Sequence, residues 1–276
     1  MPLDRDFVFS ANNLQDYLDC PRRFELKYFL KQSWPAITSH PVQEMEYKIQ
    51  MGNRFHKIVH QFLSGIPGNV LDNSIDDPDL KGWFIKFQEF IKPYLNFPYF
   101  SEFTVTMPFE GFRLIAVFDF ITLTGSNKII IGDWKTTTRN PKRELYLQSL
   151  QSFLYPFMMF ENRDHIFSQV DKLRKEDISM EYWFPAFPEK TIALEYSSVS
   201  YATSQEVFSS LIKEIAIKES GSFDKTTNDK RCAYCQYRSL CERGIQAGKV
   251  DDAENEFEDD SGLDNLDFDQ IEEITF

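Results

Sequence analysis

The sequence predicts an α/β protein, and two observations lead to this class. Residues 113–135 contain two strongly apolar runs that flank a Gly-Ser-Asn break, which is typical of two buried strands joined by a tight turn. Stretches with apolar residues at helical spacing lie on both sides of this pair along the chain, one of them at residues 42–63. Together they indicate a central sheet with helices packed against it.

The other elements can be placed in order along the chain. Ser10 is a suitable N-cap for a first helix, and Pro21 interrupts it because the residue before a proline avoids the helical region. A second helix is expected at residues 24–30, which leaves Cys20 at a helix end. Pro156 should kink or end the helix that contains it. The remaining expectations are helices at 42–63, 83–95, 144–161 and 203–219, strands at 100–109, 178–184 and 191–196, and an irregular connection at 64–80.

Each strand of the central pair carries one carboxylate, Asp119 in the first and Asp133 in the second. Burying an unpaired charge is costly, so both acids need a reason to be there. If the loop consists of residues 125–127, Thr124 pairs with Lys128. Counting back along both strands then sets the two acids opposite each other, with Cβ atoms about 5 Å apart on one face. A two-residue loop would instead place them on opposite faces.

The second strand ends in the sequence Asp133-Trp134-Lys135. Because side chains alternate along a strand, Lys135 shares the face of Asp133 while Trp134 points the other way, and the Trp134 carbonyl stays near the two charged groups. Two carboxylates, a carbonyl and a lysine are the parts of a magnesium or manganese site, since hard cations take oxygen ligands.

Two of the expected helices carry polar residues that could complete such a site. Gly52 and His56 lie one turn apart, so the missing side chain of Gly52 would let another element approach beside the imidazole. An ordinary packed histidine is the alternative, and His60 lies on the same face one turn later, so spacing does not choose between them. Gln151 and Tyr155 are four residues apart and face the same way. The alternative for Tyr155 is a buried side chain with a satisfied hydroxyl.

Three cysteines, Cys232, Cys235 and Cys241, have a C-x2-C-x5-C spacing, and Cys20 is the only other cysteine. A four-thiolate set suits either a 4Fe-4S cluster or a zinc ion. Such a metal would tie the N-terminal and C-terminal parts of the chain together around the hairpin. The alternatives are a packed core cysteine at position 20 and three free surface thiols.

The net charge of -13 is unevenly distributed. Residues 251–276 hold 12 of the 43 acids and no Lys or Arg, which leaves 31 acids against 30 bases elsewhere and room for local basic patches. The acidic tail, residues 246–276, is expected to be disordered. Its last residues alternate acids with apolar side chains and end on Phe276, so we expect either a docking segment for a protein partner or a solubilising tail. No signal-peptide order or membrane-length apolar run occurs, which indicates a soluble cytoplasmic protein without a membrane span.

Taken together, these residues resemble the PD-(D/E)xK nuclease superfamily, and within it the RecB-like nucleases that carry an iron-sulfur cluster. This group includes the CRISPR adaptation nucleases and AddB-type nuclease domains. The resemblance covers residues 10–243, and its motif order selects His56 over His60. Phe118 stands where the family often has a proline. The matching motifs are Cys20-Pro21, Gly52 to His56, Asp119, Asp133-Trp134-Lys135, Gln151 to Tyr155, and Cys232 with Cys235 and Cys241.

The resemblance implies a restriction-endonuclease-like core in residues 1–245, with a mixed central sheet flanked by helices and with its two ends joined by a four-cysteine cluster. It also implies a metal-dependent DNA nuclease, an exonuclease on single-stranded or frayed ends, that acts in repair, recombination or CRISPR adaptation. The alternative is a non-catalytic DNA-binding scaffold subunit. The implied roles are catalysis for Asp119, Asp133 and Lys135, magnesium or manganese binding for His56, Asp119, Asp133 and the Trp134 carbonyl, DNA contact for Gln151 and Tyr155, and cluster binding for Cys20, Cys232, Cys235 and Cys241.

Overall fold

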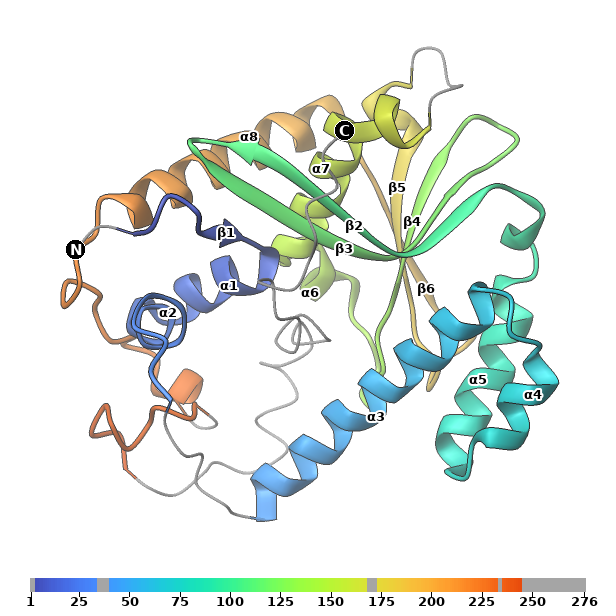
Figure 1. The fold of residues 1–276 in the computed structure, drawn as a ribbon, viewed down its shortest axis with the longest axis horizontal. Coiled ribbons are helices and arrows are strands. Elements are labelled where there is room, and N and C mark those ends of the chain that lie inside the picture. The colour runs from blue at the N-terminus through green and yellow to red at the C-terminus, as the bar shows by residue number, and fades with distance from the viewer. Residues whose placement is uncertain (1–2, 34–39, 168–172, 233–234, 245–276) are drawn as a thin grey trace.

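The computed structural model describes residues 3–33, 40–167, 173–232 and 235–244 (Figure 1). The tail expected at residues 246–276 lies outside this described part. Within it, every helix is too short or too polar to cross a lipid bilayer.

Six strands form one mixed sheet at the centre of the described structure (Figure 1). The long strand β3 pairs with antiparallel β2 along one edge, while parallel β1 and antiparallel β4 share its other edge. Next to β4 lies β5 in parallel, followed by antiparallel β6. The expected mixed sheet is therefore confirmed. The strands are β1 (Val8–Phe9), β2 (Tyr99–Phe109), β3 (Phe112–Leu123), β4 (Ile129–Trp134), β5 (Ile178–Trp183) and β6 (Thr191–Glu195).

Helices pack in two groups, each with its own apolar core. One core joins the sheet to α1 (Ala11–Asp19), α7 (Leu150–Ile166) and α8 (Ser198–Ala216). The other joins it to α3 (His40–Leu63), α4 (Gly68–Ser74) and α5 (Pro78–Ile91). The short helical segments are α2 (Pro21–Phe24), the π-helix η1 (Glu25–Phe29), α6 (Arg143–Gln148), and the 3-10 turns η2 (Tyr94–Asn96), η3 (Lys175–Asp177) and η4 (Asp229–Cys232).

The two cores fix the direction of the side chains at the end of β4. Trp134 belongs to the α3–α5 core, where its ring centroid lies 5.0 Å from that of Phe87. Ile131 belongs to the core on the α7 side. Because neighbouring strand residues point to opposite faces, Asp133 and Lys135 face α7.

The hairpin between β3 and β4 has the register that a three-residue loop requires. The backbone N–H of Thr124 donates to the carbonyl of Lys128 at 2.9 Å, and the pairing runs from Leu123 with Ile129 to Phe120 with Gly132. Asn127 closes the loop in the left-handed region with φ of 61°. Extending this register by one residue sets Asp119 opposite Asp133, as expected.

Several expected elements were wrong in their limits. The expected connection at 64–80 contains α4, and α8 begins after a Ser197 cap rather than near residue 203. The helix expected at 144–161 breaks at Ser149, and Pro156 lies inside α7. Ser149 interrupts the helix because its backbone is extended and its hydroxyl accepts from the N–H of Gln151, which makes it the N-cap of α7.

Candidate active site

Three buried polar side chains satisfy one another between β4 and α7. Lys135 Nζ donates to Gln151 Oε1 at 2.8 Å and forms an ion pair with Asp133 Oδ2 at 3.1 Å. The Gln151 amide in turn donates to Asp133 Oδ1 at 2.7 Å. Gln151 therefore bridges the acid and the lysine, rather than pointing away from them towards solvent. Tyr155, one turn later, is buried against Phe118 with ring centroids 4.9 Å apart.

A second group meets at the same strand end from the side of α3. The ring of His56 lies with Nε2 2.9 Å from the Trp134 carbonyl oxygen and Nδ1 3.3 Å from Asp119 Oδ1. The other Asp119 oxygen accepts from the backbone N–H of Trp134 at 2.9 Å. The structure thus brings together His56, Asp119 and the Trp134 carbonyl, which the sequence motifs had grouped.

Sequence reasoning missed one carboxylate in this group, Glu102 on β2. Ligand atoms of His56, Glu102 and Asp119 all lie within 4.8 Å of one another. A single cation could contact all three, and carboxylate oxygens with an imidazole nitrogen suit magnesium or manganese. Asp133 lies outside this close set in the described structure, since Lys135 and Gln151 hold its carboxylate. Nothing in the local sequence distinguishes Glu102 from an ordinary strand residue; the pairing of β2 with β3 places it there.

The pKa values in the centre reflect burial and the closeness of several charged groups. Burial alone would lower the pKa of His56, but the carboxylates of Asp119, Glu102 and Asp133 together outweigh it and raise the value to about 9. Burial followed by repulsion from Asp119 raises the pKa of Glu102 to about 7. Burial raises the pKa of Asp133 to about 6 against the opposing effect of Lys135, and it raises the pKa of Tyr155. A bound cation would favour the deprotonated form of each of these groups.

The helix α3 approaches the strand end closely because Gly52 has no side chain. A Cβ atom at this position would lie 2.9 Å from Thr136 Oγ1, immediately after Lys135 in the chain. This agrees with the expectation that Gly52 admits another element beside His56. His60, one turn further on, does not belong to the group of His56, Glu102 and Asp119. Its Nδ1 lies 2.9 Å from the hydroxyl of Ser101 on β2.

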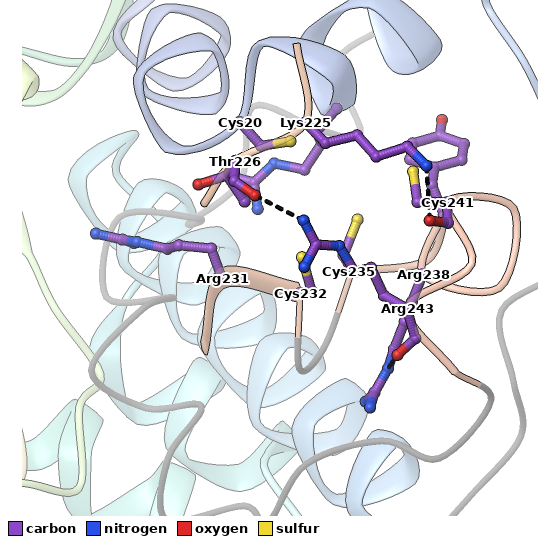
Figure 2. A pocket seen from close by; sticks show the side chains of 11 residues that line it. Cys20, Lys225, Thr226, Arg231, Cys232, Cys235, Arg238, Cys241 and Arg243 are labelled. Carbon is purple, nitrogen blue, oxygen red and sulfur yellow. Dashed lines mark hydrogen bonds between the residues drawn. The ribbon is translucent and has the colours of Figure 1, made fainter. Parts of the chain in front are cut away.

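The four cysteines meet around one cavity, although residue 20 and residues 232–241 are far apart in sequence (Figure 2). Cys20 lies at the junction of α1 and α2, as expected for a helix end. Burial, together with the neighbouring thiols, raises the pKa of Cys232, Cys235 and Cys241, that of Cys235 to about 11. The other residues around the cavity are Arg23, Lys225, Thr226, Arg231, Tyr237, Arg238 and Arg243.

Hydrogen bonds hold the two sides of this cavity together. The Arg22 backbone N–H donates to the Asp224 carbonyl at 3.0 Å, and the hydroxyl of Tyr237 donates to the Gln32 carbonyl at 3.0 Å. The buried Glu25 carboxylate accepts from the backbone N–H of Gly221 at 2.5 Å. The protein thus positions the four thiols through its own contacts, and a set of four thiols suits a structural metal.

The fold and the polar residues at the end of β4 define an α/β protein with a candidate cation centre, which is formed by acids, a histidine and a lysine. A comparison with family models matches residues 8–242 to the PD-(D/E)XK nuclease superfamily. The chain belongs to that superfamily, whose members are typically metal-dependent nucleases. Among solved structures, the chain is similar to SSO0001, with 13% identity, 86% of each chain covered and a TM-score of 0.41. A comparison with curated proteins gives no match.

Proposed function

We propose that this protein is a metal-dependent DNA nuclease that hydrolyses phosphodiester bonds. The observation that supports it most is the contact of Lys135 with both Asp133 and Gln151 beside the group of His56 and Asp119. The carboxylates of Asp119 and Asp133 and the imidazole of His56 are ligands of the kind that magnesium and manganese take, and they lie in a chain of a nuclease superfamily.

Each side chain has a distinct part in this proposal. His56, Asp119, Asp133 and the Trp134 carbonyl would hold a divalent cation, which would supply Lewis acidity to the scissile phosphate and to the attacking water. Lys135 orients that water or stabilises the charge that builds on the phosphate, because its ammonium is fixed before the reaction begins. Gln151 fixes the positions of the acid and the lysine through its two hydrogen bonds.

We propose single-stranded or frayed DNA ends as substrate, with an exonuclease mode and a role in repair, recombination or CRISPR adaptation. The resemblance to RecB-like nucleases supports this. An exposed aromatic ring, that of Phe100, lies two residues from Glu102 on β2 and is available to stack on an unpaired base. Tyr155 is buried, so in this proposal it supports the DNA site indirectly, through its position beside Gln151.

The test is cleavage of a labelled single strand with manganese. Asp133→Ala and the isosteric Asp133→Asn should abolish degradation while the folded far-UV CD spectrum is retained. The matched control is Asp164→Ala, since the Asp164 side chain is 68% exposed at the outer end of α7. Cleavage by both Asp133 variants at the wild-type rate would refute the assignment. DNA binding by the wild-type protein without turnover would favour a scaffold subunit.

We further propose that Cys20, Cys232, Cys235 and Cys241 bind a 4Fe-4S cluster, with zinc as the alternative. Among the described residues, no three of these sulfur atoms lie within 4.8 Å of one another. Tetrahedral zinc with bonds of about 2.3 Å would need sulfur atoms about 3.8 Å apart. A cluster in which each thiolate binds a different iron accepts wider spacing. Five cationic side chains lie around the cavity, and although Arg23, Arg231 and Arg243 also pair with carboxylates, the set would offset part of the negative charge of such a group.

Metal content of anaerobically purified protein decides between these alternatives. We expect a brown protein with about four irons per chain, and loss of the iron in Cys235→Ser. One zinc per chain would support the alternative, and a metal-free wild-type protein would contradict both.

Finally, we propose that the acidic tail binds a protein partner. Residues 251–276 hold 12 acids and no Lys or Arg, and the acids alternate with apolar side chains near Phe276, which supports a basic partner surface with an apolar floor. Deleting residues 251–276 should abolish partner capture. Unchanged capture and unchanged DNA affinity would reduce the tail to a solubilising segment.

A further inference from the structure

Glu102 has an unusual backbone conformation for a strand residue. Its φ is 50°, in the left-handed region that side chains other than glycine avoid. It lies in the middle of the β2–β3 ladder, where Ser101 pairs with Phe120 and Phe103 pairs with Phe118. The residue directly across from Glu102 in this register is Asp119. Strain of this kind persists only where the surrounding structure enforces it, and it is concentrated at functional sites.

At this point both β2 and β3 change the face of the sheet to which their alternate side chains point. On β3, Leu114 and Phe118 belong to the core on the α7 side, whereas Phe120 belongs to the α3–α5 core. On β2 the same change brings Phe100 and Phe103 into contact, with ring centroids 4.9 Å apart, although regular alternation would send them to opposite faces. Glu102 and Asp119 lie where both strands make this change.

Contacts to α3 hold the strand segment that immediately precedes Glu102. Ser101 is bound to His60 of α3, and the hydroxyl of Tyr99 donates to the carbonyl of Leu63 at the end of the same helix at 2.9 Å. The helix that carries His56 therefore also positions the strand segment that carries Glu102. The Glu102 carboxylate is partly exposed and lies beside His56 and Asp119.

We propose that Glu102 is a further ligand of the catalytic cation and acts in one set with His56 and Asp119. The inference rests on the proposed nuclease function and deepens it, because it adds a carboxylate from β2 to the acids of β3 and β4. The ligand atoms of the three residues already lie within 4.8 Å of one another. A cation of charge +2 would neutralise both carboxylates and remove the repulsion that the left-handed backbone enforces.

Two variants separate a ligand from a structural residue. Glu102→Gln keeps the size of the side chain and removes its charge. Glu102→Gly removes the carboxylate but adopts a positive φ without steric cost, so its melting temperature without metal should equal or exceed that of the wild type. The matched control is Glu110→Gln. Glu110 has φ of 51° in the turn between β2 and β3, where its carboxylate forms an ion pair with Lys213.

The readout is manganese affinity, measured by EPR of free Mn²⁺ and by the rise in melting temperature on adding Mn²⁺. We expect both Glu102 variants to bind Mn²⁺ at least tenfold more weakly and to lose most of that rise, while Glu110→Gln behaves like the wild type. Wild-type affinity in both Glu102 variants would overturn the inference and leave the nuclease proposal intact. A wild-type protein that neither binds Mn²⁺ nor cleaves DNA would overturn the nuclease proposal, and this inference with it.

Discussion

Substituting Gly52 by alanine tests how closely α3 must approach the end of β4, where the proposed active site lies. The new Cβ would lie 2.9 Å from Thr136 Oγ1, closer than side-chain carbons approach in folded proteins. Thr136 follows Lys135 directly as the chain leaves β4, so a shift of Thr136 moves the lysine. His56 lies on the same helix one turn later, so a shift of the helix would instead move the imidazole.

The size of the effect follows from two opposing contributions to stability. Overpacking one methyl group costs about 1–3 kcal/mol, while alanine in a helix interior is favoured over glycine by about 1 kcal/mol. The net loss in the free energy of unfolding is therefore about 0–2 kcal/mol. A displacement of about 1 Å at a catalytic group costs about 100-fold in rate, so cleavage should fall far more than stability.

Single-turnover cleavage of a labelled DNA strand, paired with urea unfolding, measures both quantities. Gly82→Ala is the matched control, because a Cβ at Gly82 in α5 meets no atom within 4 Å and should leave cleavage unchanged. Adding Thr136→Ala to the Gly52 variant removes the clashing oxygen and should restore most of the lost rate. Wild-type cleavage in the single variant, or no recovery in the double variant, would refute the reasoning.

Three further substitutions test Lys135, the aromatic core and a half-buried acid. Lys135→Met should lower the cleavage rate by about 10²–10³-fold in single-turnover assays, because preorganised positive charge is lost. Phe87→Ala should destabilise the fold by about 3–5 kcal/mol in urea unfolding, since this fully buried ring contacts both Trp134 and Trp183. Burial raises the pKa of Glu181, so its contribution to stability is present below about pH 4 and is lost as pH rises through the folded-state value. Glu181→Gln should therefore match the wild type in urea midpoint at low pH and exceed it at pH 8; a gain that does not depend on pH would contradict this.

The sequence by itself determined the hairpin and the groups of motif residues. Gly125, Ser126 and Asn127 predicted a tight turn between two strands, and because the side-chain period of a strand is two, a three-residue loop sets Asp119 opposite Asp133 whereas a two-residue loop would not. The structure has the register of the three-residue loop. Gly52 likewise predicted a close approach beside His56, since only a missing Cβ leaves that space. The count of four cysteines led to the expectation that Cys20 would join Cys232, Cys235 and Cys241, and the structure places all four around one cavity.

The tertiary structure alone decided how these residues contact one another. Gln151 reaches Asp133 and Lys135 because the chain breaks at Ser149 and α7 then packs across β4, and no local pattern encodes that packing. Glu102 enters the centre through the pairing of β2 with β3 and a left-handed backbone that nearby contacts enforce. Propensity and periodicity describe neighbours along the chain. A cation site depends on atoms from several elements within a few ångströms, which only the packed sheet and helices bring together.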